Sequence, residues 1–251
     1  MPEAYIVDAI RTPVGKKKGS LSGIHPADLG AHPLQALFER TDMDPAVVED
    51  VVYGCVDTIG GQAGDIARSC WLVAGLPEEV PGTTIDRQCG SSQQAVHFAA
   101  QAVMSGTMDV VVAGGVQQMN QIPISSAMLA GSLLGFPDPF RTSPGWQRRY
   151  GNQEVSQFRS AEMIAEKWDC SREEMEVFGL ESNNRALRAI EEGRFEREIV
   201  PFGTFEKDET PRQSSLEKMA RLRTLEEGGR VTAGVSSQIA DAASAMLIVS
   251  E

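Results

Sequence analysis

The sequence predicts an α/β layered fold, because short apolar strands alternate with helical segments through its first half. Two β-branched runs, residues 48–56 and 109–115, have the composition of buried strands. The second run ends at Gly114 and Gly115, as expected for a central strand whose end lies close to other backbone. Of the 251 residues, 41% are hydrophobic and 23% are charged, which is an ordinary globular composition.

The first half of the chain divides into alternating segments bounded by Gly and Pro. The predicted strands are 4–10, 48–56, 83–86 and 109–115, and the predicted helices are 26–41, 62–75 and 89–105. Pro33 lies within the first helical segment, where it removes a backbone donor and crowds the preceding turn. We therefore expect a kink at Pro33, or a helix that begins near it.

The middle of the chain has a different composition. Residues 119–152 carry few charges and many Pro and Gly residues, so they predict a long excursion that packs over something and adds no strand. Two helices are predicted to follow, at about 157–168 and 171–193. Ser171 and Glu174 have the spacing of a capping box at the start of the second helix.

The last segments return the chain to the sheet. A charged connector at 203–230 leads to a final apolar run, AMLIVS, which predicts a strand of the first sheet. We therefore predict a half-domain made of residues 1–118 plus 231–251, interrupted by a mainly helical loop domain of residues 119–230.

The charge balance limits the partners of the chain. It has 23 Lys+Arg and 35 Asp+Glu, a formal net charge of -12 and a pI near 4.8. Such a chain repels phosphate backbones, which argues against nucleic acid as a partner. An anionic nucleotide-containing thioester would need a local basic patch. Lys16–Lys18 and Arg148–Arg149 are candidates, although basic runs of this kind usually form solvated surface.

Compartment and metal content are predicted from short patterns. The amino terminus lacks the basic start, apolar stretch and cleavage site of a signal peptide, and no run approaches the roughly 18 apolar residues of a membrane span. The four cysteines, Cys55, Cys70, Cys89 and Cys170, form no CxxC pair and no zinc-ligand spacing with histidine. The sequence thus predicts a cytoplasmic chain with no membrane contact and no bound metal.

Residues 85–106, IDRQCGSSQQAVHFAAQAVMSG, carry the strongest chemical signal. A strand ends, a tight turn follows, and a helix is predicted to begin at Cys89, the only one of the four cysteines expected at a helix amino terminus. At a helix amino terminus, unsatisfied N–H groups and the helix dipole favour a thiolate, which is the nucleophilic form of the sulfur. Small neighbours leave room for a carbonyl group, and the Cys89 N–H can donate to an oxyanion that forms on it. On spacing alone, a small buried cysteine is the more common interpretation.

The order of short motifs along the whole chain decides between these interpretations. The motifs are VxGC (52–55), AGLP (74–77), TxxxQCGS (84–91), VVAGG (111–115), AExIA (161–165), SREE (171–174), EGRFEREIVPF (192–202) and VTAG…D…A (231–242). Together they resemble the thiolase family of coenzyme A-dependent acyltransferases. The forms NQxxxQF (152–158), VFGLES (177–182) and TAGxSSQIxD (232–241) are similar to degradative thiolases that shorten steroid side chains.

The resemblance implies a two-step ping-pong reaction. Cys89 matches the family's acyl-accepting cysteine, which attacks a 3-ketoacyl thioester so that the carbon–carbon bond breaks and an acyl-enzyme remains. Coenzyme A then takes the acyl group, and the reverse reaction is a Claisen condensation. Coenzyme A is therefore implied as a substrate, with no permanently bound cofactor. The family's fold is a layered αβαβα arrangement of two similar halves, of which this chain resembles the first, and a homo-oligomer is expected.

The resemblance places the inserted loop domain on the coenzyme A side. The matched residues are Thr232, Ala233, Gly234 and Ser237, beside the pantetheine arm, and Arg212, beside a phosphate. Several positions depart from the usual pattern; among them, Gln117 replaces an acidic residue, Val235 an asparagine and Ala242 a glycine. These changes favour a different or bulkier substrate than acetoacetyl-CoA.

The family's second half supplies an NEAF asparagine, a GHP histidine and a CxG cysteine, and the sequence contains none of these motifs. His97 lies about two turns into the predicted helix of Cys89 and is expected to be packed or interfacial. Without groups for proton transfer, the chain is expected to be a truncated thiolase that is inactive alone.

Other readings of the remaining residues stay open. Cys55, Cys70 and Cys170 fall on apolar faces and are expected to fill the core. One alternative function is a non-catalytic thiolase-like subunit or lipid-binding scaffold that pairs with another chain. Another is a ketoacyl synthase, against which the AGLP and TAG motifs and the long inserted domain fit thiolases better.

Overall fold

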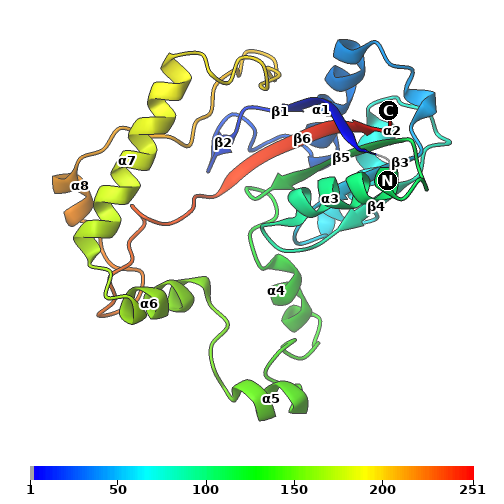
Figure 1. The fold of residues 1–251 in the computed structure, drawn as a ribbon. Coiled ribbons are helices and arrows are strands. Elements are labelled where there is room, and N and C mark those ends of the chain that lie inside the picture. The colour runs from blue at the N-terminus through cyan, green and yellow to red at the C-terminus, as the bar shows by residue number, and fades with distance from the viewer. Residues whose placement is uncertain (1–2) are drawn as a thin grey trace. The chain divides into compact units, whose positions relative to one another are not determined.

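A mixed six-stranded sheet is the framework of the fold (Figure 1). The computed structural model describes residues 3–251. The strands are β1 (Tyr5–Arg11), β2 (Gly15–Lys16), β3 (Asp50–Gly54), β4 (Gly82–Ile85), β5 (Val110–Gln118) and β6 (Ala240–Val249). Their order is β1-β6-β5-β3-β4, with β2 beside β6. β3 pairs in parallel with β4 and β5, whereas β6 pairs antiparallel with β1, β2 and β5.

Helices make up much of the remaining chain. They are α1 (Pro26–Thr41), α2 (Ile66–Val73), α3 (Ser91–Met104), α4 (Ser126–Leu133), α5 (Pro144–Tyr150), α6 (Gln157–Lys167), α7 (Arg172–Glu191) and α8 (Leu216–Ala220), with 3-10 turns at Pro45–Val47 and Gly60–Gln62. α5, α6, α7 and α8 each begin after a serine whose hydroxyl accepts a backbone N–H. Serine satisfies otherwise unpaired donors at a helix start, which fixes where these helices begin.

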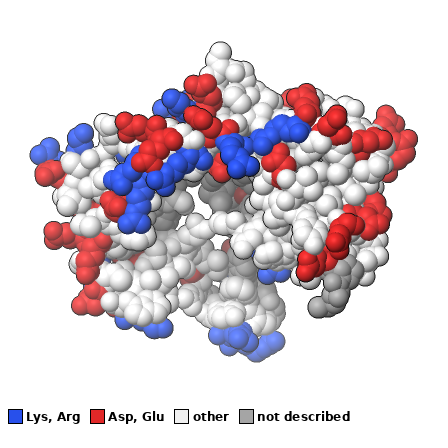
Figure 2. Space-filling model, turned by 45° about the horizontal axis from the view of Figure 1, so that its top comes forward, with Lys and Arg blue, Asp and Glu red and all other residues white. Residues whose placement is uncertain are grey.

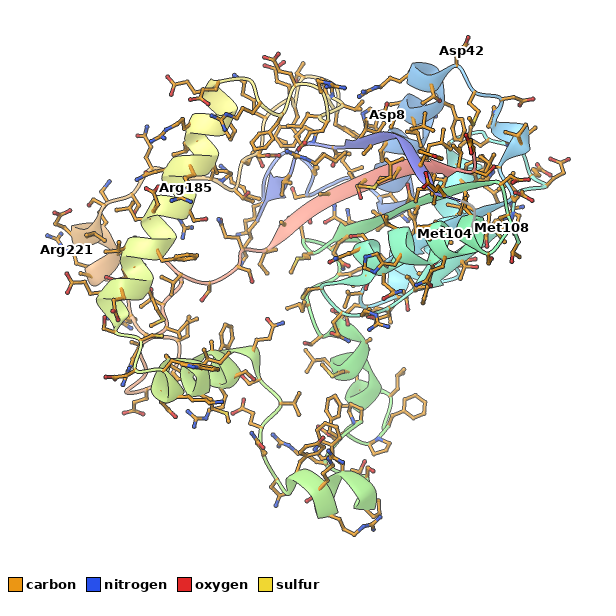
Figure 3. The ribbon with its side chains drawn as sticks, in the orientation of Figure 1. Asp8, Asp42, Met104, Met108, Arg185 and Arg221 are labelled. Atoms are coloured by element: carbon orange, nitrogen blue, oxygen red, sulfur yellow. The ribbon has the colours of Figure 1, made fainter. Side chains whose placement is uncertain are left out.

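Two hydrophobic cores lie on opposite faces of the sheet. The larger contains residues of α1 and α2 with Val51 and Leu247, and the smaller contains α3 residues with Val52 and Ile248. Successive side chains of a strand point to opposite faces, so the neighbours Val51 and Val52 face different cores. α3 contributes Ala95, Ala99 and Val103 at helical spacing and ends at Met104, close to Met108 (Figure 3). Small α3 residues therefore hold this helix close to the sheet.

The chain forms two compact units. The first comprises the residues up to 127 together with 195–210 and 239–251, and it contains the sheet and α1 to α3. The second comprises residues 128–194 and 211–238 and contains α5 to α8. Within the first unit, Arg11 of β1 pairs with Glu198 and Asp208, both at 2.7 Å. This pairing attaches the 195–210 segment to the sheet.

The observed elements confirm the predicted α/β class and the predicted central position of the strand that becomes β5. The 119–152 excursion contains α4 and α5 and no strand, as expected. α1 begins at Pro26 and continues through Pro33, so the alternative of a helix beginning near Pro33 is wrong. The reason is a good start farther upstream, where proline occupies the first turn and the His25 side chain accepts the Ala27 N–H at 3.2 Å.

Charge is distributed without a single dominant sign on the face drawn in Figure 2, where basic side chains lie among acidic ones. The candidate basic pair Arg148 and Arg149 lies in the last turn of α5. In the part of the chain that the structure describes, no helix combines the length and apolarity needed to cross a membrane. Within residues 3–251, no three His, Cys, Asp or Glu side chains form a group that could hold a metal ion.

Candidate active site

The carboxyl-terminal ends of three parallel strands meet at one edge of the sheet. β3 ends at Gly54 and β4 at Ile85, while Gly115 of β5 lies in register with Gly54. The Cys55 N–H donates to the Ile85 carbonyl oxygen at 3.1 Å, which ties the end of β3 to the chain leaving β4. This edge is where ligands usually bind in parallel α/β sheets. The predicted nucleophile, Cys89, lies in the turn that leaves β4 here.

A tight, hydrogen-bonded turn presents Cys89. The Asp86 carboxylate accepts the Gln88 N–H at 2.7 Å. The Ser91 hydroxyl accepts the Arg87 N–H at 2.9 Å and donates to the Gln88 carbonyl at 2.6 Å. Gln88 has a φ of 50°, a left-handed conformation that strains a non-glycine residue. The surrounding hydrogen bonds hold this strained residue directly before the cysteine, so the position of the thiol is closely determined.

Cys89 itself is exposed at the amino-terminal end of α3. The helix begins at Ser91 with Gly90 as its N-cap, so the predicted start at residue 89 is wrong by two residues. The reason is that the Ser91 hydroxyl bonds to the backbone of Arg87 and Gln88, which keeps residues 87–90 in a turn and delays the start of the helix. α3 has no side-chain cap. The Ser91 N–H donates to the Gln88 carbonyl at 3.1 Å, and the N–H groups of Ser92 and Gln93 that follow are left for a ligand or a charged sulfur.

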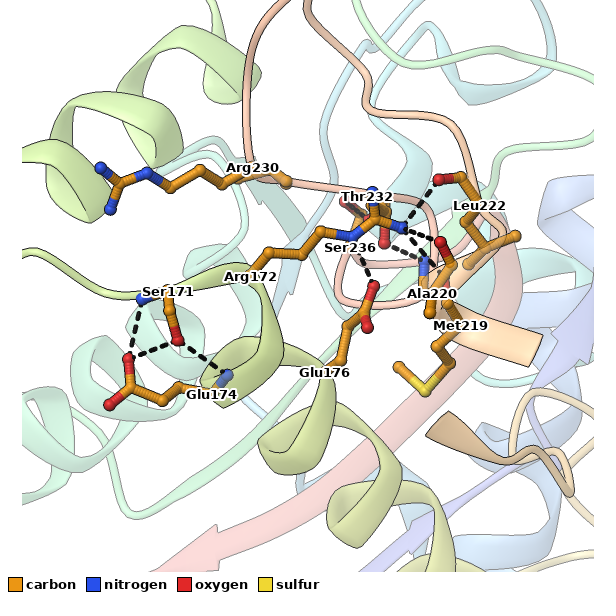
Figure 4. Close-up of polar contacts among 12 residues, drawn as sticks. Ser171, Arg172, Glu174, Glu176, Met219, Ala220, Leu222, Arg230, Thr232 and Ser236 are labelled. Atoms are coloured by element: carbon orange, nitrogen blue, oxygen red, sulfur yellow. Dashed lines mark hydrogen bonds and ion pairs between the residues drawn. The ribbon is translucent and has the colours of Figure 1, made fainter. Parts of the chain in front are cut away.

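A second cysteine has the same place relative to a helix. Cys170 immediately precedes Ser171, the N-cap of α7, and is half-buried. Two expectations are therefore wrong: that Cys170 fills the core, and that Cys89 alone lies at a helix amino terminus. The two helix starts differ in their capping. Ser171 and Glu174 satisfy each other's backbone N–H groups (Figure 4), whereas α3 lacks a side-chain cap.

The other two cysteines are core residues, as predicted. Cys55 is 2% exposed and Cys70 is fully buried. Burial raises the pKa of Cys55 to about 12, and the Asp86 and Asp57 carboxylates raise it further. Burial also raises the pKa of Cys70. Because the thiolate is the nucleophilic form, both cysteines are unreactive at neutral pH.

Glycines allow α3 to approach the strand ends closely. A Cβ atom at Gly54 would overlap the backbone carbon of Ser91 and the backbone nitrogen of Ser92. A Cβ at Gly115 would lie 2.6 Å from the Gly54 carbonyl oxygen and 3.0 Å from the Cβ of Ser92 in α3. Backbone atoms cannot move aside as the end of a flexible side chain can. Gly54 and Gly115 therefore set the distance between the sheet and the start of α3, next to Cys89.

The three histidines lie elsewhere in the described residues. The His25 side chain caps the first turn of α1, and His32 Nε2 lies 2.8 Å from the Pro201 carbonyl oxygen. His97 is exposed on α3, eight residues beyond Cys89, which corresponds to about 12 Å along a helix axis. The expectation that His97 is packed within this chain is wrong, because it lies on the face of α3 turned away from the sheet. An interfacial role for it stays a prediction.

A polar clamp behind the strand ends was missed by the sequence analysis. The Gln117 amide donates to the Val56 carbonyl at 3.1 Å and accepts the Val56 N–H at 3.0 Å. The buried Gln62 also donates to that carbonyl at 2.9 Å. Asp57, which follows Val56 in the chain, accepts two backbone N–H groups at the start of α4, at 2.8 and 2.9 Å. The sequence signal for this clamp was Gln117 in place of the family's acidic residue. An amide can both donate to and accept from the Val56 backbone, whereas a carboxylate can only accept.

The second compact unit contains the residues predicted to contact coenzyme A. Arg212 Nη2 donates to the Ala233 carbonyl at 3.1 Å, which brings two of them together. The Gly234 N–H donates to Thr232 Oγ1 at 3.2 Å, and Ser237 is exposed three residues farther along. These residues form one turn with Arg212 against it. Their binding of coenzyme A stays a prediction.

The frame of the Cys89 turn can be tested by removing one hydroxyl. Ser91→Ala is expected to lower the free energy of unfolding by about 1–3 kcal/mol, because the partly buried Arg87 N–H loses its acceptor. Ser92→Ala, at the exposed neighbouring position, is the control and should change stability little. Urea unfolding of both variants gives the comparison. Equal midpoints for the two variants would show that the Ser91 hydroxyl does not hold the turn.

Known proteins share the sequence pattern and the fold of this chain. Residues 4–251 match the family model described as the N-terminal domain of thiolase. An acetyl-CoA acetyltransferase from Bacillus anthracis has a similar crystal structure, with a TM-score of 0.81 and 31% sequence identity. That alignment covers 100% of this chain and 66% of the other chain. The match supports the layered fold described above.

Sequence relatives are similarly longer than this chain. A steroid 3-ketoacyl-CoA thiolase from Mycobacterium tuberculosis is 62% identical over the whole of this chain and 63% of its own length. A beta-ketoadipyl-CoA thiolase from Acinetobacter baylyi is 38% identical, again over the whole chain and 67% of its own length. The chain thus spans about two thirds of the length of these curated relatives.

Proposed function

Because the chain belongs to the thiolase family, we propose that it provides the nucleophile and part of the coenzyme A site of a 3-ketoacyl-CoA thiolase. The observation that supports this most is the setting of Cys89. Its thiol is exposed, it follows the strained Gln88, and it lies at an uncapped helix start, whereas Cys55 and Cys70 are buried as thiols. The activity that we propose is that of an acyltransferase.

The proposed reaction has two covalent steps. The Cys89 thiolate attacks the 3-keto carbon of the substrate, and the bond between the second and third carbons breaks. Acetyl-CoA leaves as its enolate, which takes a proton, and the shortened acyl chain remains as a thioester on Cys89. The thiol of a second coenzyme A then loses a proton and attacks this thioester, which releases the shortened acyl-CoA and the Cys89 thiolate.

The start of α3 suits the charge that develops in both steps. A negatively charged oxygen forms on the attacked carbonyl carbon, bonded to the Cys89 sulfur. Uncapped N–H groups at a helix amino terminus are donors already aimed at such a charge. We propose that the Cys89 N–H and the first turn of α3 contribute to stabilising it. The close packing permitted by Gly54 keeps these donors fixed during the reaction.

Proton transfer requires groups that residues 3–251 do not bring to Cys89. His25 and His32 are engaged in α1 contacts, and His97 lies about two helical turns from the thiol. General acid and base groups each contribute about 10²–10⁴-fold to such reactions. We propose that these groups come from a second half-domain of the kind that complete thiolases contain.

The substrate class follows from resemblance and from departures in the sequence. The 62% identical relative carries the name steroid 3-ketoacyl-CoA thiolase. We propose a degradative reaction on a bulky acyl chain, with coenzyme A as a substrate, no permanently bound cofactor and no metal.

A cytoplasmic location and assembly into a homo-oligomer, dimer or tetramer, complete the proposal. The partly exposed α3 face with Phe98 is consistent with burial in an assembly.

The function can be tested with two proteins. One is the 251-residue chain, and the other is a hybrid protein in which this chain is joined to the remaining part of the Mycobacterium tuberculosis relative. We expect the chain alone to show no thiolysis of a 3-ketoacyl-CoA, and the hybrid protein to show turnover at least about 10²-fold above background. Thiolysis is followed by loss of the 3-ketoacyl-CoA absorbance.

Two results would contradict the proposal. Turnover by the chain alone, at the rate of the hybrid protein, would show that the proton-transfer groups lie within the 251 residues. A folded hybrid protein with neither turnover nor an acyl adduct on Cys89 would instead favour a non-catalytic subunit or lipid-binding scaffold. Mass spectrometry of the peptide that contains Cys89 distinguishes this second case.

A further inference from the structure

A buried carboxylate lies behind the turn that contains Ala233. Glu162, in α6, is 3% exposed. Its Oε1 accepts the N–H of Val231 at 2.7 Å and of Arg230 at 2.8 Å, and its Oε2 accepts the Arg230 N–H at 3.0 Å. None of the ion pairs within residues 3–251 includes Glu162. Because a buried carboxylate is costly without hydrogen bonds, Glu162 depends on these two backbone groups.

The Arg230 side chain makes a second link between the α6 region and residues 230–231, this time as the hydrogen-bond donor. Its Nη1 donates to the carbonyl oxygen of Cys170 at 2.8 Å and of Ala165 at 3.4 Å, just past and within α6. The Glu162 side chain thus holds the Arg230 backbone, while the Arg230 side chain holds backbone of the segment that carries Glu162. Gly229 makes room for this arrangement, because a Cβ there would overlap the Glu162 carboxylate.

The proposed coenzyme-contacting turn follows directly after the backbone that Glu162 holds. Thr232, next to Val231, is fully buried. Its carbonyl accepts the Ser236 hydroxyl at 2.9 Å (Figure 4). Its own hydroxyl accepts the Gly234 N–H. The backbone from 230 to 236 is therefore fixed at its start by Glu162 and closed on itself by Thr232. Exposed Ala233 lies at the tip of this turn.

We infer that Glu162 is a positioning residue for coenzyme A, which preforms the Thr232–Gly234 turn by holding the backbone of Arg230 and Val231. This inference rests on the proposed function. A turn that is ordered before binding does not have to lose conformational entropy when the ligand arrives, so the ligand binds more tightly. Glu162 acts through the backbone and does not itself touch the coenzyme.

Substitution of the carboxylate by an amide tests this role. In Glu162→Gln an NH₂ group replaces one oxygen and opposes the Arg230 N–H, donor against donor. We expect the Kd for coenzyme A, measured by isothermal titration calorimetry on the 251-residue chain, to rise about tenfold. Alkylation of Cys89 by iodoacetamide, followed by peptide mass spectrometry, should stay within about twofold, since that site lies in the other unit.

Glu166→Gln is the matched control, because Glu166 lies one turn later on α6 and pairs with Arg159 at an exposed position. Its Kd should equal that of the unsubstituted chain. If Glu162→Gln does not fold, Gly229→Ala displaces the carboxylate independently and should weaken binding in the same way.

An unchanged Kd in the folded Glu162 variant, or in Gly229→Ala where that variant is the one that folds, would overturn the inference. A parallel change in Cys89 alkylation would also overturn it, because the residue would then support the fold in general. Failure of the proposed function gives a different result: the unsubstituted chain then binds no coenzyme A, and Glu162 has no coenzyme to position.

Discussion

Cys89→Ala in the hybrid protein is expected to lower thiolase turnover on the order of 10⁴-fold or more, because no other group can carry the acyl chain. The exposed thiol lies at the only edge of the described sheet where three parallel strand ends converge. Cys55, at the same edge, stays protonated at neutral pH because burial raises its pKa to about 12. Steady-state assays with a 3-ketoacyl-CoA measure the loss.

A covalent readout makes the same test more specific. Incubation with acyl-CoA should give an acyl adduct on the Cys89 peptide of the unsubstituted hybrid protein and none in Cys89→Ala. Cys170→Ala is the matched control, since Cys170 also lies one residue before a helix N-cap. It should keep full turnover, because a capping box occupies the start of α7. An adduct on Cys170, with turnover retained in Cys89→Ala, would overturn the assignment of the nucleophile.

The strands and helices of the sheet unit were predictable because local sequence and tertiary packing agree there. The β-branched run at 109–115 becomes β5, and its two glycines lie where backbone approaches backbone. Two features needed long-range information. β6 begins at Ala240, before the apolar run, because its ladder with β5 extends to the pair Gln118–Asp241. α1 begins at Pro26 despite Pro33, since burial of its apolar face outweighs one lost hydrogen bond.

The candidate site was predictable only where a motif marks it. Cys89 follows from the strand–turn–helix sequence and the family resemblance, whereas the setting of Cys170 was missed because this cysteine was assigned to an apolar face. Glu162 appeared only as one letter of the AExIA motif. Its bonds to Arg230 and Val231 join residues 68 and 69 positions apart, which no local periodicity can indicate. The Gln117 clamp on Val56 was hidden for the same reason.

Gly54→Ala is expected to lower stability strongly, because the added methyl group meets backbone atoms of Ser91 and Ser92. Overpacking of this kind costs about 3 kcal/mol when the neighbours cannot move. For a chain of this length, that corresponds to a fall in Tm of roughly 6–12 °C. Thermal unfolding followed by circular dichroism measures the shift. Gly23→Ala is the control, since a Cβ there meets nothing within 4 Å.

The same substitution should also displace the nucleophile, which separates it from destabilisation elsewhere in the sheet. Gly114→Ala places its methyl group against the Ser244 carbonyl of β6, so it should lower stability without moving the start of α3. Compared below the unfolding temperature of both variants, Gly54→Ala should change the rate of Cys89 alkylation and Gly114→Ala should not. Equal alkylation rates would show that α3 absorbs the methyl group without moving Cys89. The close contact at Gly54 would then stabilise the fold but would not position the thiol.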